Sequence, residues 1–258
     1  MIVKLVSAIG HRVLSWVEGM GRISTFLAQA TVAGIARPRP RRFLDELFTI
    51  GVLSLSVITV SGAAVGMVLG LIGYNTLARF GAEQNLGAVV AITLIKELGP
   101  VLTALLVAGR AGSAVAGEIG SMVATEQIDG LRMMALDPID FVVSPKLYSF
   151  ITVLPLLSAL FIAFGLAGGY IAGVQILEVD SGDYLSGIES SITFSNEVMM
   201  TLIKALVFGG IVGLIATYRG YHASPNVVGV SRATTAAVVA ASVSVLIADY
   251  FVTALWEV

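Results

Sequence analysis

Four charged side chains lie inside long apolar stretches of the sequence, where charges are rare. They are Lys96, Glu97, Lys204 and Asp249. A charge in the middle of a membrane costs roughly 2.5–3.5 kcal/mol on insertion scales, so such residues usually mark function. The four charges sum to zero. Two interpretations therefore stand together: a structural network of ion pairs, and a polar spot in a cavity that meets a charged substrate headgroup.

The adjacent pair Lys96 and Glu97 is expected to make contacts outside its own helix. Neighbouring positions on a helix do not face each other, so the two side chains point to different partners. Pro100 stands four residues after Lys96 and has no N–H to donate to its carbonyl. We expect the helix to be loosened here, and at least one of the two side chains to reach another helix or a polar cavity.

A second group of polar residues lies in the segment 117–138, which begins GEIGSMVATEQIDGL. Its acids are followed by two methionines, and we interpret it as a short amphipathic helix that docks in a partner protein. A helix resting on the membrane surface is the alternative, which the acids disfavour because an anionic cytoplasmic leaflet repels them. The candidate docking residues are Glu118, Glu126, Gln127, Asp129, Met133 and Met134.

Signatures of enzymatic and metal sites are missing from the sequence. There is no cysteine, and the two histidines, His11 and His222, lie far apart, which supports neither a zinc site nor a catalytic triad. No lysine is followed by serine or threonine, so there is no P-loop. We therefore expect no catalysis, no metal and no cofactor in this chain, and no nucleic-acid partner. The energy for any work then comes from a partner or an ion gradient.

The elements that position these residues are predicted to be membrane helices. Mean hydropathy is +0.93 and only 12% of the residues are charged, about half the fraction usual in soluble domains. About 20 apolar residues suffice to cross a bilayer, and five such spans are predicted: 47–78, 84–109, 147–177, 198–218 and 233–256. We predict an all-α integral membrane protein. An odd number of spans without internal duplication also predicts a homodimer, because a translocation path usually needs two related halves.

The region before the first span is predicted to have two parts. Apolar residues recur at three- and four-residue steps through residues 2–29, with a polar stripe opposite. Residues 1–36 are therefore predicted to form an amphipathic helix in the membrane interface. Residues 37–46 form a basic linker, whose RPRPRR run we expect to be extended because of its two prolines. The membrane domain then covers residues 47–258.

Lysine and arginine are distributed unevenly around the spans. With the N-terminus in the cytoplasm, twelve of the fifteen lie in cytoplasmic segments and one, Arg79, in an outer segment. The positive-inside rule therefore places the N-terminus and the loop 110–146 in the cytoplasm, and the C-terminus on the outer side.

Small residues recur at four-residue spacing within the spans. Gly62, Gly66 and Gly70 form one such series, and Gly165, Gly169 and Gly173 another. Ridges of this kind let helix backbones approach closely. We expect them to serve packing within one subunit, with packing between two subunits as the alternative.

Three long motifs resemble the MlaE family of permeases: VSGAAVGMVLGLIGY, LIKELGPVLTALLVAGRAGSAVAGEIGSMVATEQIDGLRMMALDP and GVSRATTAAVV. Members of this family are membrane subunits of an ABC system that moves phospholipids between the inner and outer membranes of Gram-negative bacteria and so maintains outer-membrane lipid asymmetry. The resemblance implies a permease homodimer in the bacterial inner membrane. It also implies two MlaF-type ATPases, which bind ATP and Mg²⁺, each with an MlaB-type STAS protein, and an outer hexamer of MlaD-type MCE subunits.

The resemblance further implies roles for particular residues. The segment 117–138 corresponds to the family's coupling helix, which inserts into a groove of the ATPase. The family's lipid cavity opens outward at the dimer interface and is lined by the first, second and fifth spans. Implied acyl-chain contacts are Leu69, Leu71, Tyr74, Leu77 and Phe80. Lys96 and Glu97 stand at the family's basic–acidic pair before LGP, and with Lys204 and Asp249 they are the candidate headgroup contacts.

Two other classes of function are compatible with the residues. A proton-driven secondary transporter of an amphipathic substrate would titrate Glu97 or Asp249, but it has no need of the acidic cytoplasmic segment. A passive scaffold that anchors an outer ring would not need the charges within the spans. An intramembrane hydrolase is disfavoured because no nucleophile–base pair is visible. Transport by the isolated protein without ATP would favour the first alternative, and dispensable charges the second.

Overall fold

The computed structural model describes residues 2–191 and 197–257, with side chains for residues 18, 19, 21–191 and 197–256. In this part of the chain every regular element is a helix, as predicted. The α-helices are α1 (Ile2–Ala36), α2 (Pro40–Ile50), α3 (Leu55–Leu77), α4 (Leu86–Thr93), α5 (Gly99–Val107), α6 (Ser113–Ala124), α7 (Gln127–Met133), α8 (Ser144–Tyr170), α9 (Ser181–Ser191), α10 (Met199–Tyr221) and α11 (Val227–Glu257). The π turns are η4 (Leu94–Leu98), η5 (Ala108–Gly112), η6 (Ile139–Val143) and η7 (Ile171–Ile176), and the 3₁₀ turns are η1 (Val52–Ser54), η2 (Ala78–Phe80) and η3 (Glu83–Asn85).

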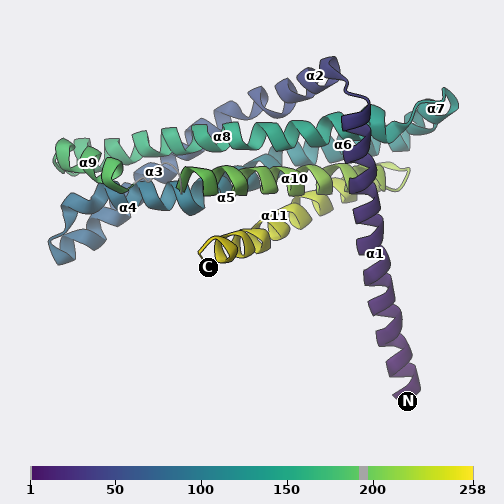
Figure 1. Cartoon of the computed structure of the whole chain (residues 1–258), viewed down its shortest axis with the longest axis horizontal. Coiled ribbons are helices and arrows are strands. Elements are labelled where there is room, and N and C mark those ends of the chain that lie inside the picture. The colour runs from purple at the N-terminus through teal and green to yellow at the C-terminus, as the bar shows by residue number, and fades with distance from the viewer. Residues whose placement is uncertain (1, 192–196, 258) are drawn as a thin grey trace.

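Five helical stretches in the described chain are long and apolar enough to cross a membrane, which confirms the predicted number of spans. They cover Pro40–Phe80, Glu83–Ala124, Ile139–Ile176, Met199–Tyr221 and Val227–Trp256. Figure 1 shows these stretches running along the long axis of the molecule, whereas α1 passes across one end of the bundle and projects away from it. A helix crosswise to membrane spans has the arrangement expected of an interfacial helix.

The segment between the second and third spans is helical over much of its length, in agreement with the predicted helix within 117–138, but the predicted end of the second span at residue 109 was wrong. The second span continues beyond residue 109 through η5 and α6 and ends only at Ala124. The physical reason is packing: the small residues of α6 lie against α10 and α11, and a Cβ at Gly117 would stand 3.1 Å from the methyl of Thr234. Two short helical pieces, α7 and η6, then lead into α8.

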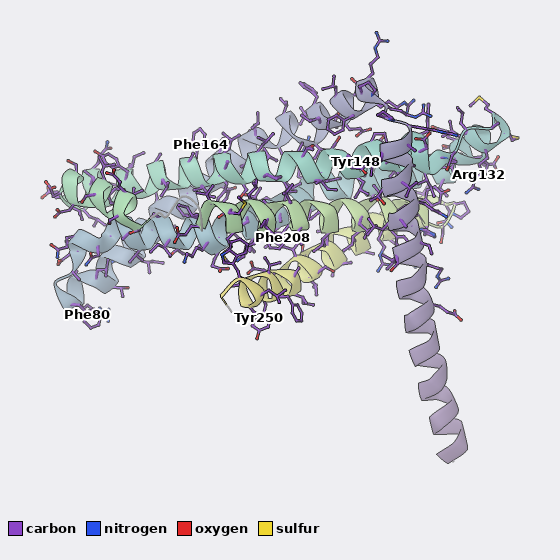
Figure 2. All side chains as sticks on the ribbon, in the orientation of Figure 1. Phe80, Arg132, Tyr148, Phe164, Phe208 and Tyr250 are labelled. Atoms are coloured by element: carbon purple, nitrogen blue, oxygen red, sulfur yellow. The ribbon has the colours of Figure 1, made fainter. Side chains whose placement is uncertain are left out.

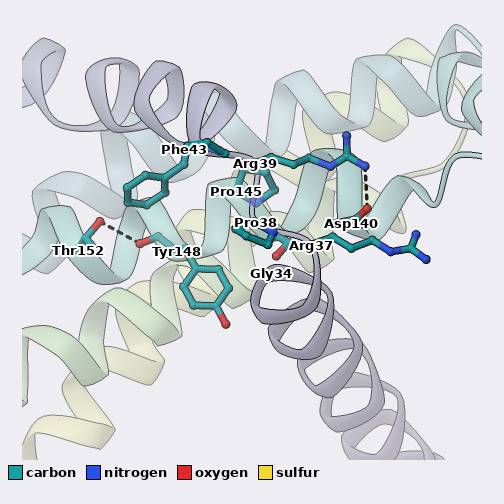
Figure 3. A pocket seen from close by; sticks show the side chains of 11 residues that line it. Gly34, Arg37, Pro38, Arg39, Phe43, Asp140, Pro145, Tyr148 and Thr152 are labelled. Atoms are coloured by element: carbon teal, nitrogen blue, oxygen red, sulfur yellow. Dashed lines mark hydrogen bonds and ion pairs between the residues drawn. The ribbon is translucent and has the colours of Figure 1, made fainter.

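The basic linker is also shorter than predicted. Only residues 37–39 lie between α1 and α2, and the helix begins at Pro40. The expected extended run was wrong beyond residue 39 because proline, which needs no hydrogen-bond acceptor for an N–H, is favoured in the first turn of a helix. Figure 3 shows the resulting elbow, in which Arg39 makes an ion pair with Asp140 at 2.8 Å.

Contacts with α8 and α10 hold α1 against the bundle. Tyr148 on α8 donates a hydrogen bond to the carbonyl of Thr31 at 3.0 Å, and Ser144 donates to that of Ala30 at 2.8 Å. Farther along α1, the ring of Phe26 meets the ring of Tyr218 edge-on, with 5.4 Å between centroids. Hydrogen bonds and a buried ring thus fix the C-terminal half of α1 to α8 and α10.

The predicted glycine ridges pack against each other within one chain. A Cβ at Gly66 would collide with the backbone of Gly165, and one at Gly62 would stand 2.7 Å from the carbonyl oxygen of Phe161. Helices α3 and α8 therefore approach at backbone contact, which only glycine permits. This contact fixes the first span to the third and confirms packing within one subunit as the role of this ridge.

Candidate functional site

Three of the four charges within the spans meet at one point, with Lys204 of α10 at the centre. The Lys204 side chain has no exposed surface. Its Nζ lies 2.9 Å from Oε2 of Glu97 on η4 and 2.8 Å from Oδ1 of Asp249 on α11. The contact with Glu97 is also a hydrogen bond, whereas Oδ1 of Asp249 lacks hydrogen-bond geometry in the described chain, so that contact is an ion pair only. One buried ammonium thus joins the second, fourth and fifth spans.

The lysine also fills a gap in the backbone of the second span. The helix widens to a π turn before Pro100, which leaves carbonyl oxygens without their usual N–H donors. Lys204 Nζ donates to the carbonyl of Lys96 at 2.9 Å, and Thr201 Oγ1 donates to that of Ile95 at 2.6 Å. Side chains of α10 therefore satisfy the backbone that the proline frees, and the predicted loosening at this pair is confirmed.

Lys96 and Glu97 have different partners, as their adjacency predicts. Lys96 Nζ lies 3.8 Å from Oε1 of Glu197 rather than in the Lys204 cluster, and its side chain is half-buried. Glu97 keeps 41% of its side chain exposed and receives a long contact of 3.5 Å from the Thr253 hydroxyl. The cluster is therefore buried on the lysine side and open on the glutamate side, where a polar group can approach it.

The five candidate acyl-chain contacts divide into two groups. Leu69, Tyr74 and Leu77 are partly buried and pack on the hydrophobic core, whereas Leu71 and Phe80 are exposed. Figure 2 shows Phe80 at the end of the bundle opposite to Arg132. In the single chain, the exposed pair offers a lipid more surface than the three partly buried residues do.

An apolar groove of about 410 Å³ next to the charged cluster was not predicted from the sequence. It lies between α8 and α10 and is lined by Ile95, Pro155, Ala159, Ile162, Ala163, Leu166, Val198, Thr201, Leu202 and Ala205. The proline inside α8 was the one available signal, because prolines disturb membrane helices where neighbouring elements compensate. The groove itself depends on how two helices diverge, which periodicity does not encode.

A second buried lysine joins three helices at the end of the bundle that α1 crosses. Lys146 of α8 is 2% exposed, and its Nζ lies 2.6 Å from Oε1 of Glu46 and 2.8 Å from Oε2 of Glu118. Glu118, a candidate for docking a partner, thus forms an ion pair within the chain, although half of its side chain is exposed. This triad joins α2, α6 and α8, so these three charges have a structural role.

The remaining docking candidates lie on or beside α7, which is a short helix with exposed methionines, as predicted. Ile128 and Leu131 are buried and hold α7 to the body, whereas Met133 is 85% exposed. Arg132 bonds to Asp129 within the helix at 2.8 Å and to the hydroxyl of Tyr221 on α10 at 2.8 Å. The hydrogen bond to Tyr221 and the ion pair raise the pKa of Arg132, so it stays charged. Glu126, Gln127 and Met134 are exposed at the two ends of α7.

Comparison with known proteins assigns this arrangement to a family. Residues 43–255 match the family described as Permease MlaE. The chain belongs to the MlaE permease family. It is 44% identical over 259 residues to the intermembrane phospholipid transport system permease protein MlaE of Haemophilus influenzae, with 99% of this chain and 98% of that protein covered. It is also 38% identical to a probable ABC transporter permease protein of Rickettsia bellii, with 99% of each chain covered.

Membership of the MlaE permease family confirms the resemblance seen in the three sequence motifs. It makes the chain a multi-pass permease subunit rather than an enzyme, in agreement with the missing catalytic signatures. A probable ABC transporter permease protein of Synechocystis is 34% identical over 82% of this chain and 80% of its own length. The match to the family model begins three residues into the first span and ends one residue before the end of the fifth, and both buried lysines lie within it.

Proposed function

We propose that the chain is the membrane subunit of an ATP-driven ABC transporter that moves phospholipids between the inner and outer membranes. The observation that carries this proposal is the position of α10. One end of α10 contacts α7 through the hydrogen bond between Tyr221 and Arg132, and the other holds Lys204 in the charged cluster. The two points are 17 residues apart in sequence, about 25 Å along a helix.

The cytoplasmic end fits the role of a coupling site. A separate ATPase that grips α7 would contact the exposed Met133 and Met134 and the acids Glu126 and Asp129, since polarisable methionines adapt to grooves. Its motion would reach α10 through Arg132. Glu118 would support this surface without contacting the ATPase, because its ion pair with Lys146 fixes α6, the helix that precedes α7.

The membrane end fits a lipid that carries both charge and acyl chains. Glu97 offers an anion on the open side of the cluster, and the adjacent Lys96, outside the cluster, offers a cation, which together suit a zwitterionic headgroup. Leu71 and Phe80 offer exposed apolar surface for acyl chains. A second copy of the chain would complete the cavity, because the exposed faces of α3 and α11 have no partner helix among the described residues.

The proposed assembly has the composition implied by the family. Two permease chains in the bacterial inner membrane, each with its N-terminus in the cytoplasm and its C-terminus in the periplasm, would bind two MlaF-type ATPases with MlaB-type STAS proteins. A hexamer of MlaD-type MCE subunits would cover the outer side. ATP and Mg²⁺ would bind in the ATPase and not in this chain.

The test is lipid transfer per ATP hydrolysed by the purified complex in proteoliposomes. Tyr221→Phe removes only the hydroxyl that Arg132 binds, and its matched control is Tyr148→Phe, which removes a hydroxyl that binds the carbonyl of Thr31. We expect Tyr221→Phe to retain ATP hydrolysis and transfer less lipid for each ATP. Equal transfer by the two variants would contradict this coupling route.

The charged cluster also favours a second candidate, a proton-driven transporter. Glu97 and Asp249 both contact Lys204 in the membrane, and acid–base clusters of this kind occur in proton relays. The two functions are distinguished by liposomes that contain the permease alone. Lipid movement that responds to an imposed pH gradient without ATP would support the second candidate, and its absence the first.

A further inference from the structure

A cationic hollow of about 640 Å³ lies at the cytoplasmic end of the bundle, where α1 crosses the turn between α10 and α11 (Figure 1). Three arginines from three helices line it: Arg22 on α1, Arg219 on α10 and Arg232 on α11. The other polar lining residues are Tyr218, His222, Ser224 and Asn226, and no acid is among the lining residues described.

These three arginines have no counter-ion in the part of the chain that the structure describes. All three are exposed, and none makes an ion pair with a described residue, whereas Arg39 and Arg132 each hold a carboxylate at 2.8 Å. The hollow also contains the start of α11, where a helix N-terminus adds partial positive charge. Like charges gathered from three elements repel one another, so an anion bound between them would relieve that repulsion.

The level of the hollow indicates what the anion is attached to. Its inner edge is formed by Ala233 and Ala236, which lie at the start of the predicted fifth span. Its outer edge is formed by Arg22 of the interfacial helix, which Phe26 pins to Tyr218. Farther along α11 from the hollow, the apolar side chains of Val239 and Val243 are exposed. A ligand with a charged head at this level and acyl chains beneath is a lipid of the cytoplasmic leaflet.

We propose that this hollow binds the phosphate of an anionic phospholipid from the cytoplasmic leaflet. Guanidinium groups form paired hydrogen bonds with phosphate oxygens. Three positive charges favour a headgroup with a net negative charge over a zwitterionic headgroup, whose net charge is zero. The bound lipid holds α1 against the turn between α10 and α11. This site goes beyond the proposed transport, because it lies at the cytoplasmic end, whereas Phe80 and the other candidate contacts for the transported lipid lie toward the opposite end.

The test is a titration of the delipidated complex with phosphatidylglycerol, followed by native mass spectrometry. Arg219→Gln with Arg232→Gln removes two of the three charges. The matched control, Arg37→Gln with Arg41→Gln, removes two exposed cytoplasmic charges outside the hollow. We expect the first pair to weaken the tightest phosphatidylglycerol binding about 30-fold, or ~2 kcal/mol at about 1 kcal/mol per arginine, and the control pair to leave it unchanged.

Two further measurements keep the result interpretable. Arg219→Lys with Arg232→Lys retains both positive charges, so we expect this variant to retain most of the phosphatidylglycerol binding. Its binding shows whether the glutamine pair loses the lipid through loss of charge or through misfolding. Hydrogen exchange along residues 21–30 of α1 should slow when phosphatidylglycerol binds. Equal binding by the glutamine pair and the control would overturn the proposal. If millimolar inorganic phosphate displaced the bound lipid as well as phosphatidylglycerol does, the proposal would also be overturned. Loss of the ATPase from the glutamine pair with lipid binding unchanged would overturn it too, because the surface would then bind a protein.

Discussion

Replacement of Lys204 by methionine tests whether the buried ion cluster is needed for the fold. The change keeps the length of the side chain and removes the ammonium that Glu97 and Asp249 share. Removing one partner of a buried pair costs about 3–5 kcal/mol, because an uncompensated charge remains. Glu97 is 41% exposed and can be rehydrated, whereas Asp249 is only 20% exposed and cannot. We therefore expect the lower end of the range, about 3 kcal/mol.

The assay is reversible unfolding in mixed micelles with increasing denaturing detergent, monitored by circular dichroism. Lys96→Met is the matched control, because Lys96 keeps 36% of its side chain exposed and its pair with Glu197 is long at 3.8 Å, so we expect its loss to cost about 1 kcal/mol or less. Lys204→Met combined with Asp249→Asn removes the orphaned buried acid as well. We expect this double variant to regain more than half of the lost stability, as a double-mutant cycle would reveal.

Two results would refute this reasoning. A loss for Lys204→Met no larger than that for Lys96→Met would mean that the buried cluster does not hold the helices together. A double variant as unstable as the single one would mean that the lysine acts through the carbonyl of Lys96, which it also binds, rather than through the acids.

Three other changes test separate parts of the same structure. Neutralising Lys96 and Glu97 together should reduce the phospholipid that copurifies with the complex, while size-exclusion chromatography shows the complex intact; unchanged lipid would exclude a headgroup role. Glu126→Lys with Asp129→Lys should release the ATPase or uncouple it, and full ATP-driven transfer by this variant would contradict docking at α7. Gly66→Ala should severely lower the yield of folded protein, because the Cβ of the new alanine would collide with the backbone of α8. Gly210→Ala, at a position with open space around it, should leave the yield unchanged. Equal yields of the two variants would refute the close contact.

The sequence alone was sufficient for the architecture. Hydropathy located all five spans, and the proline after Lys96 predicted the defect in the second span, because both are local properties of the chain. The extended linker was predicted wrongly because a proline can either prevent a helix or begin one, and Pro40 begins α2. The end of the second span was predicted too early, at residue 109, because α6 is stabilised by contact with α10 and α11, which are distant in sequence.

The site was predictable only in part. The charges within the spans were recognisable because a charge inside a membrane is energetically unfavourable. Their pairing was not predictable: Lys96 pairs with Glu197, whereas Lys204 pairs with both Glu97 and Asp249. The partner of Glu118 could not be predicted from the sequence either, because Lys146 lies on another helix. Pairings across helices depend on rotation and depth, and neither is fixed by spacing within one helix.

The two buried lysines have a common relation to the second span. Lys146 binds Glu118 near the C-terminal end of this span, and Lys204 binds Glu97 nearer its N-terminal end. The two glutamates are 21 residues apart in sequence, about 30 Å along a helix. The second span is thus tied to α2 and α8 at one level and to α10 and α11 at another. Because α7 comes directly after this span and also bonds to α10, we expect force applied at α7 to act on both ties together. A displacement of α7 should therefore change the contacts of Glu97 as well as those of Glu118.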